Sequence, residues 1–400
     1  MKIGFLGNTN NFPFMLARAF RRAGHDVLVI VNRREKLHRP EFRYSDISYP
    51  YPDWIREIIY PDETAFVTRS AARRDTLELL RICDFVVLND LGTCLAGDIG
   101  RPYLSLLTGS DLSFYCDPNS GSRVLEAMTT RNPLKRIWGR IVWRRLLAAQ
   151  RDGVRRASLV FHFARGLIPS GDSLLDEIGV DEAQRIFFLM ADIDAIYPTP
   201  FPENSRLRTF CATRLTWKKP MLPGDSNLDF KGSDIMVRGL GLFHRKTSAP
   251  LDINLVRKGR HVEETMKLIS SEGLDKITTW HNEMTQADIW QQYAEADVIF
   301  EQFGDGIVAM AGLEAMASGR PLIANGRPDV FEPLLGESSP ICQAIEPEDV
   351  CRHLEKLAQD TDYRKSLGLR SREWVERHFT PDAAARRILS RLNAIDTGRN

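Results

Sequence analysis

Short apolar runs alternate with amphipathic stretches along the first half of the chain. Residues 2–6 and 27–31 are apolar runs, and 13–23 between them carries apolar residues at helical spacing. A strand, a helix and a second strand in this order pack as a parallel unit, so the pattern predicts a Rossmann-like domain. Further strands of the same sheet are expected at 85–88 and 102–107.

The second half has the same alternation. Predicted strands at 207–213, 251–256 and 276–280 alternate with predicted helices at 233–243 and 262–272. A chain of 400 residues also exceeds the usual size of one hydrophobic core. We therefore expect an α/β fold with two Rossmann-like domains.

A proline-rich stretch without helical or strand periodicity, 190–202, separates the two halves. The predicted organisation is an N-terminal domain at 1–191, a hinge at 192–206, a C-terminal domain at 207–379 and a terminal helix at 380–400.

Residues 34–62 are irregular and rich in proline and tyrosine. They are expected to form loops over the carboxyl end of the first sheet, where open α/β sheets bind ligands. A disordered surface insertion is the alternative.

The stretch 297–324 suggests an anion site. An apolar run leads to Gly304-Asp305-Gly306, and a helix is then expected at 307–317. Unpaired N–H groups and a partial positive charge at a helix N-terminus suit a phosphate. Glu314, about two turns inside the helix, could then reach a ribose or sugar hydroxyl. The alternative is an ordinary strand-helix-strand unit in which Glu314 is solvated or caps a neighbouring element.

The segment GLEAMASGRPLI at 312–323 closely resembles the donor-binding signature of GT-B glycosyltransferases, in particular the retaining group 1, or family 4, enzymes. By this resemblance Glu314 holds the nucleotide ribose. The first Glu of the family pattern falls at Gly306, where the chain departs from it, and nearby polar residues are possible substitutes. The implied donor-binding set is Gly304, Asp305, Gly306, Ala311, Gly312, Leu313 and Glu314, with Glu301 and Gln302 as further substitutes for the missing carboxylate.

Two cations follow from the same resemblance. ATRLTWKK at 212–219 is similar to the family strand that ends in Gly-Arg-Leu, and LDFKGSD at 228–234 is similar to its Lys-Gly. Arg214 and Lys231 would then clamp the donor diphosphate and stabilise the charge of the leaving group. Lys218 and Lys219 are reserves for this role.

The N-terminal half also carries candidate residues. KIGFLG at 2–7 resembles the opening of GT-B N-terminal domains, whose first loop lies near the diphosphate, so Gly7 and Asn8 are donor-binding candidates. Gly7 has no partners for a G-x-G-x-x-G pattern, so a dinucleotide site is not expected. Gly109-Ser110-Asp111 follows a predicted strand and resembles the GSD turn of many related transferases, so Asp111 is a catalytic candidate that could hold an acceptor or sugar hydroxyl, and Ser110 is an acceptor-site candidate. The alternative is a turn in which Ser110 and Asp111 cap the next helix. His162 is a core histidine or an acceptor-site candidate.

Residues 132–157 form a basic amphipathic segment. A stripe of Leu134, Ile137, Trp138, Ile141 and Val142 lies among eight Lys and Arg residues and the single acid Asp152. This pattern is typical of a helix at an anionic membrane surface, of a helix that buries its stripe, or of a groove for anionic sugars.

Composition excludes several other classes. The formal net charge of +1 argues against an electrostatic nucleic-acid partner, and the six scattered cysteines have no zinc-ligand spacing. Asp192-Ile193-Asp194 resembles a metal-binding D-x-D, but it lies in the predicted hinge, so neither a metal nor a cofactor is expected. No signal peptide or membrane-spanning run is predicted, which indicates a cytoplasmic protein, with peripheral association at the inner membrane face through 132–157 as a further expectation.

These features together predict a GT-B fold, with two Rossmann-like domains facing across a cleft and the terminal helix crossing back to the first. The implied activity is retaining, metal-independent transfer of a sugar from a nucleotide-diphosphate-sugar to a glycan, a glycolipid or a small hydroxylated acceptor. A non-catalytic nucleotide-sugar or glycan-binding scaffold of the same fold and a nucleotide-sugar epimerase are the alternatives.

Overall fold

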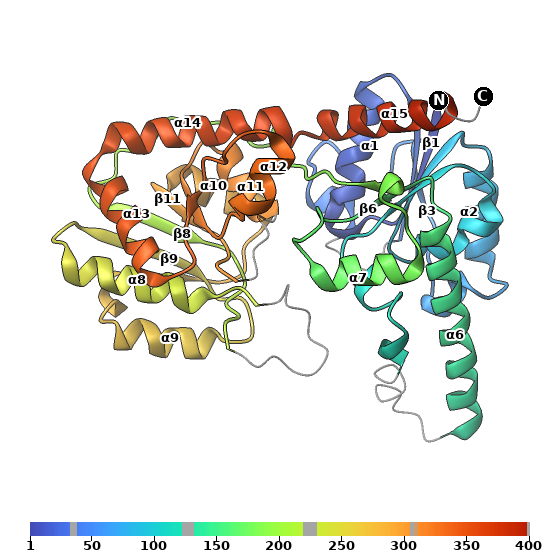
Figure 1. Ribbon diagram of the computed structural model, residues 1–400, viewed down its shortest axis with the longest axis horizontal. Helices are drawn as coiled ribbons and strands as arrows, with labels where there is room; N and C mark the ends of the chain where they lie inside the picture. Colours follow the sequence, from blue (N-terminus) through green and yellow to red (C-terminus); the bar gives the residue numbers. More distant parts are fainter. Residues whose placement is uncertain (33–37, 122–131, 219–229, 305–307, 309, 398–400) are drawn as a thin grey trace. The chain divides into compact units, whose positions relative to one another are not determined.

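The computed structural model describes residues 1–32, 38–121, 132–218, 230–304, 308 and 310–397. Two compact units divide the chain (Figure 1). The first contains Met1–Phe188 together with Ala384–Asn400, and the second contains Leu189–Ala383. The chain therefore leaves the first unit once and returns to it at its C-terminal end.

Unit 1 is built on a parallel sheet whose described strands have the order β3-β2-β1-β4-β5-β6-β7. The strands are β1 (Lys2–Leu6), β2 (Asp26–Val31), β3 (Ile55–Glu57), β4 (Phe85–Asn89), β5 (Tyr103–Leu106), β6 (Leu159–Phe161) and β7 (Arg185–Ile186). Near-continuous apolar runs such as FVVLN in β4 form the central strands because helices cover both faces of a parallel sheet. β3 was not predicted. It lies in the irregular stretch 34–62 and pairs with β2, with Ile55 opposite Val29.

The helices of unit 1 include α1 (Phe12–Arg22), α2 (Ala71–Arg81), α3 (Ala96–Ile99), α4 (Ser110–Ser113), α6 (Pro133–Arg155) and α7 (Pro169–Ile178). The last helix, α15 (Pro381–Thr397), runs beside α1 in Figure 1, and Arg387 donates a hydrogen bond to the Phe187 carbonyl at 2.6 Å. The N-terminal half of α6 extends well beyond the sheet (Figure 1).

Unit 2 contains a second parallel sheet, with the described strands in the order β10-β9-β8-β11-β12-β13. Its strands are β8 (Leu207–Cys211), β9 (Leu251–Val256), β10 (Thr278–His281), β11 (Val298–Phe300), β12 (Leu322–Ala324) and β13 (Cys342–Gln343). The helices are α8 (Ser233–Lys246), α9 (Val262–Ser271), α10 (Gln286–Glu295), α11 (Met310–Ala317), α12 (Pro328–Leu335), α13 (Pro347–Gln359) and α14 (Thr361–His378). Two parallel α/β sheets confirm the predicted fold class.

The predicted hinge packs against unit 2 rather than forming an independent linker. The buried Arg320 guanidinium donates to Thr199 Oγ1 at 2.8 Å and to the Pro200 carbonyl at 3.1 Å. Arg372 of α14 donates to the Ile196 carbonyl at 2.6 Å. Carbonyl groups that a proline-rich segment cannot pair within itself are thus bonded to these arginines.

In the described ranges, no helix is both long and apolar enough to cross a lipid bilayer.

Candidate functional site

Each sheet has one position where the strand order reverses, and open parallel sheets bind ligands at the carboxyl ends of the strands there. In unit 2 this position lies between β8 and β11. Arg214, an exposed residue, follows β8, and Glu301 and Gln302 follow β11 directly. Arg214, Glu301 and Gln302 therefore follow the two strands at the edge where a ligand is expected.

Lys231 is bonded to two loops, the one that follows β8 and the one that follows β11. Its backbone N–H donates to the Thr216 carbonyl at 2.7 Å, and its own carbonyl accepts from the Phe303 N–H at 2.8 Å. Its ammonium donates to Gln302 Oε1 at 2.7 Å, and the Gln302 side chain is buried. A cation held in this way has little rotational freedom left to lose when it binds an anion.

Glycine allows the loops to approach this closely. Gly232 has a positive φ of 61°, and a Cβ at Gly304 would lie 2.1 Å from the Phe230 carbonyl oxygen. Any side chain at Gly304 would force the two loops apart. Asp305 and Gly306 lie outside the described residues.

Glu314 lies inside α11 and is buried. Its Oε2 accepts hydrogen bonds from Gln286 Nε2 at 2.7 Å and from Trp290 Nε1 at 3.4 Å, both on α10. The carboxylate thus joins two helices through side-chain hydrogen bonds. A ribose contact would have to share or replace these bonds, and it stays a prediction.

The other candidates of α11 are mostly packed inward. Leu313 and Gly312 are buried, and a Cβ at Gly312 would lie 3.4 Å from Cγ of Glu301. The Ala311 carbonyl accepts from the Tyr293 hydroxyl at 3.4 Å. Their donor-binding role stays a prediction.

Asn325 is a site residue that the sequence analysis missed. It follows β12, donates to the Gly304 carbonyl at 2.8 Å, and receives a bond on its Oδ1 from Gln343 Nε2 at 2.9 Å. The only signal was a polar residue directly after the apolar run 321–324. The reserve cation Lys218 pairs with Glu264 at 2.9 Å, and Lys219 is outside the described residues.

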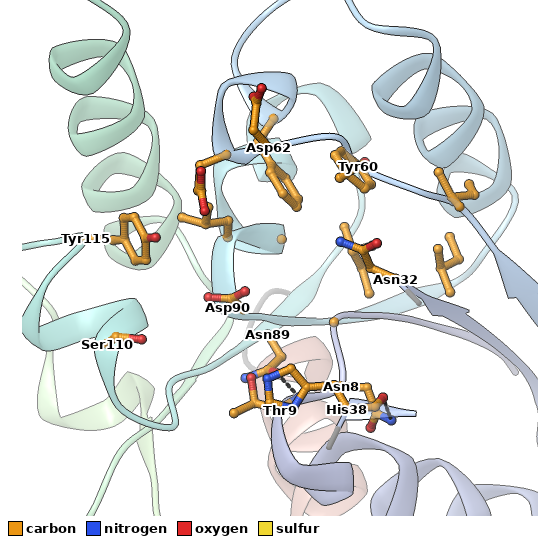
Figure 2. Close-up of a pocket in the computed structure, with 18 residues that line it drawn as sticks. Asn8, Thr9, Asn32, His38, Tyr60, Asp62, Asn89, Asp90, Ser110 and Tyr115 are labelled. Atoms are coloured by element: carbon orange, nitrogen blue, oxygen red, sulfur yellow. Dashed lines mark hydrogen bonds between the residues drawn. The ribbon is translucent and has the colours of Figure 1, made fainter. Parts of the chain in front are cut away.

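Unit 1 has a polar cavity of about 450 Å³ at its own reversal point, between β1 and β4. Its lining residues come from the carboxyl ends of the five strands β1 to β5 or from the segments that follow them (Figure 2). The labelled residues that line it are Asn8, Thr9, Asn32, His38, Tyr60, Asp62, Asn89, Asp90, Ser110 and Tyr115, and Gly7 also contributes. Hydroxyl, amide and carboxylate groups in one cavity suit a ligand rich in hydroxyl groups.

Gly7 and Asn8 shape the floor of this cavity. Gly7 has a φ of 88°, and a Cβ there would lie 2.6 Å from the Asn89 carbonyl oxygen. The Asn8 side chain donates to Asn11 Oδ1 at 2.7 Å and to the His38 carbonyl at 2.8 Å, and accepts from the Phe14 N–H at 3.0 Å. Asn8 therefore holds the first loop in place.

Asp111 is 1% exposed and its carboxylate accepts from the backbone N–H groups of Thr108, Gly109 and Leu112 at 2.7 to 3.0 Å. Burial raises its pKa, and these hydrogen bonds oppose that rise. The side chain stabilises the turn into α4, and its neighbour Ser110 lines the cavity.

His162 is not among the residues that line the cavity. Burial and the nearby Arg185 lower its pKa to about 4, so the ring is neutral near pH 7. Neither ring nitrogen has a hydrogen-bond partner in the described part of the chain. A Cβ at Gly171 would lie 2.4 Å from Nε2, which indicates tight packing around the ring.

No protein-family model matches the chain, and no curated protein matches it. Among solved structures it is similar to Anabaena HepE in complex with UDP and glucose, at 15% identity and a TM-score of 0.64, over 98% of this chain and 100% of that one. It is also similar to sucrose-phosphate synthase from Thermosynechococcus elongatus, at 14% identity and a TM-score of 0.57 over the full length of both chains. WaaG, a glycosyltransferase involved in lipopolysaccharide biosynthesis, matches at 13% identity and a TM-score of 0.53, over 96% and 98%. The chain therefore has the fold of the GT-B glycosyltransferases.

Proposed function

We propose that the chain is a retaining glycosyltransferase that moves a sugar from a nucleoside diphosphate sugar to a hydroxyl group of a glycan, a glycolipid or a small hydroxylated acceptor. The observation that supports this most is the Lys231 ammonium, bonded to Gln302 at the reversal point of the second sheet. A diphosphate bound there would have its developing charge beside a preorganised cation. Because HepE has been solved with UDP-glucose, UDP-glucose is the first donor to test.

In this proposal the bond between the anomeric carbon and the phosphate oxygen breaks, and the acceptor oxygen bonds to the anomeric carbon on the same face. The acceptor proton moves to the leaving phosphate oxygen. Arg214 and Lys231 stabilise the negative charge, and Glu314 binds the ribose. No metal ion is assigned a role.

The partners follow from this activity: a nucleotide-sugar donor, a glycan or lipid-linked acceptor, and an anionic membrane surface that the basic segment 132–157 contacts. The protein would work at the cytoplasmic face of that membrane.

Thermal unfolding with a panel of nucleoside diphosphates and nucleotide sugars tests donor binding, because a ligand that binds only the folded state raises Tm. Lys231→Ala is expected to weaken donor binding by about 10- to 100-fold, the loss of one charge-assisted contact. Lys246→Ala is the matched control, since Lys246 is exposed on α8 and pairs with Glu355. A protein that no member of the panel stabilises would contradict the proposal.

Donor turnover separates the enzyme from a non-catalytic binding protein, the alternative that Gly306 at the family's Glu position suggests. An enzyme releases UDP from UDP-glucose in the presence of acceptor, and Lys231→Ala lowers this rate by about 10²–10³. Donor binding without turnover for any acceptor class would support the scaffold.

A further inference from the structure

A second hollow of unit 1, of about 560 Å³, lies along α6 and is mainly apolar. The turn after α4 and the segment around Glu63 form its other walls. Its lining residues are Glu63, Thr64, Phe114, Tyr115, Lys135, Trp138, Gly139, Val142, Trp143 and Leu146. We call this hollow the α6 groove.

The α6 groove adjoins the polar cavity. Glu63 and Tyr115 line both hollows. Figure 2 shows Tyr115 at the margin of the polar cavity, and its ring centroid lies 5.9 Å from that of Trp143 in the groove. The two hollows are therefore neighbours with Glu63 and Tyr115 at their common border, and a ligand with a polar and an apolar part that passes these two side chains would occupy both.

The apolar wall of the groove continues onto an exposed surface. Positions 134, 138, 142 and 146 follow one another at four-residue spacing on α6 and share one face. Along this face the exposed fraction falls from 74% at Leu134 to 53% at Trp138, 5% at Val142 and 2% at Leu146. Ile137 and Ile141 widen the exposed end, at 53% and 41%. The groove thus opens toward solvent through large apolar side chains, which monomeric proteins rarely gather without a ligand or an interface.

The exposed end is also strongly basic. Lys135, Arg136, Arg140, Arg144 and Arg145 are all exposed there. No ion pair within the described ranges includes any of the five, whereas Arg151, Arg155 and Arg156 farther along α6 pair with carboxylates. Apolar side chains among uncompensated cations complement the surface of a bilayer whose lipid head groups carry phosphates.

We propose, on the basis of the proposed function, that the acceptor is a lipid with an uncharged, hydroxylated head: the head occupies the polar cavity, and the first part of the hydrocarbon chain lies in the α6 groove. The exposed end of α6 contacts the bilayer from which this lipid enters. The groove then selects lipid-linked acceptors over free sugars, because burying hydrocarbon adds binding energy that a free sugar lacks.

Binding of n-octyl, n-nonyl and n-decyl β-glucoside below their micelle concentrations, measured by titration calorimetry on the whole chain, tests the groove. The Kd is expected to fall about fourfold for each added methylene group. Trp138→Ser removes one wall of the groove, and Gly139→Leu fills the groove from the helix. Both variants should show a smaller fall in Kd for each added methylene group. Ile137→Ser is the matched control, because Ile137 is as exposed as Trp138 on the same helix but does not line the groove.

A Kd that does not depend on chain length would overturn the inference, as would equal behaviour of Trp138→Ser and Ile137→Ser in variants whose Tm is that of the parent. This test needs no donor. Failure of every nucleotide to stabilise the protein would contradict the transferase proposal separately, and a retained methylene increment would still support a hydrocarbon site.

Discussion

Replacing Glu314 by Gln distinguishes a carboxylate that binds a donor from one that only joins two helices. The Glu314 side chain is 4% exposed, and its Oε2 receives the short Gln286 bond at 2.7 Å and the longer Trp290 bond at 3.4 Å. Gln has nearly the same size, keeps one acceptor oxygen and has no charge. The substitution therefore tests the charge with little change in packing.

The expected cost to the free protein is small. A hydrogen bond to a charged group contributes about 1.5–3 kcal/mol, and one between neutral groups about 0.5–1.5 kcal/mol. Weakening the Gln286 bond in this way lowers the free energy of unfolding by about 1 kcal/mol, or Tm by about 2–4 °C in a domain of the size of unit 2.

The expected effect on the ligand is larger. A ligand at a hundred times its Kd stabilises the folded state by about 2.7 kcal/mol. If loss of the ribose contact weakens binding tenfold, this stabilisation falls to about 1.4 kcal/mol, so the rise in Tm with donor is about halved.

The assay compares Tm with and without UDP-glucose for the parent, Glu314→Gln and Glu332→Gln, whose side chain is exposed on α12. The control should keep the full ligand-induced shift. An unchanged shift in Glu314→Gln, with only the small loss of Tm in the free protein, would refute the ribose contact and leave the bond to α10 as the role of this residue.

Three further perturbations test other parts of the molecule. Gly7→Ala should lower the free energy of unfolding by about 2–3 kcal/mol, because Gly7 has a positive φ and an added Cβ would meet Asn89. Gly24→Ala is the control: its φ is 85°, but no atom lies within 4 Å of an added Cβ, so the loss should be only about 1 kcal/mol. Equal losses in chemical denaturation would contradict the close contact between Gly7 and Asn89. His162 has a pKa of about 4 in the folded chain and 6.5 in the unfolded chain, so the unfolded state binds the proton more tightly. The free energy of unfolding therefore falls by about 3 kcal/mol as the pH falls from 6.5 toward 4. His162→Phe should flatten this part of the curve of stability against pH, and a curve equal to that of the parent would show that the ring is not buried as described. The parent protein should sediment with vesicles that contain phosphatidylglycerol, and the variant with Glu at positions 140, 144 and 145 should not. A control variant with Glu at positions 365, 370 and 386 should sediment like the parent. Equal sedimentation of both variants would exclude the basic end of α6 as the membrane contact.

Local pattern was sufficient for the architecture of this protein. The apolar runs at 2–6, 85–88 and 251–256 predicted buried parallel strands because burial on both faces demands such runs, and the helical spacing between them predicted the covering helices. The short edge strand Ile55–Glu57 was missed because its three residues have no strand pattern of their own, and their extended conformation depends on pairing with β2.

The sequence alone also indicated which loops carry polar chemistry, since a polar residue after a buried strand lies at the edge of a parallel sheet. Ser110 was found in this way, whereas Lys231 and Gln302 were indicated by the resemblance to the GT-B donor motifs. The partners of these side chains belong to the tertiary structure: the bond from Lys231 to Gln302 joins residues 71 positions apart, and nothing local specifies it. The polar cavity of unit 1 likewise needs residues from the carboxyl ends of five different strands or from the segments that follow them.

For the basic segment 132–157, composition predicted an amphipathic helix but left open whether its stripe is buried. Packing decided this differently along one helix: Leu146 and Val142 are covered by unit 1, while Leu134 and Ile137 extend past it. The covalent sequence determines which faces are apolar, because side-chain spacing is a local property. Which of those faces is covered depends on where the rest of the fold ends, and only the folded chain contains that information.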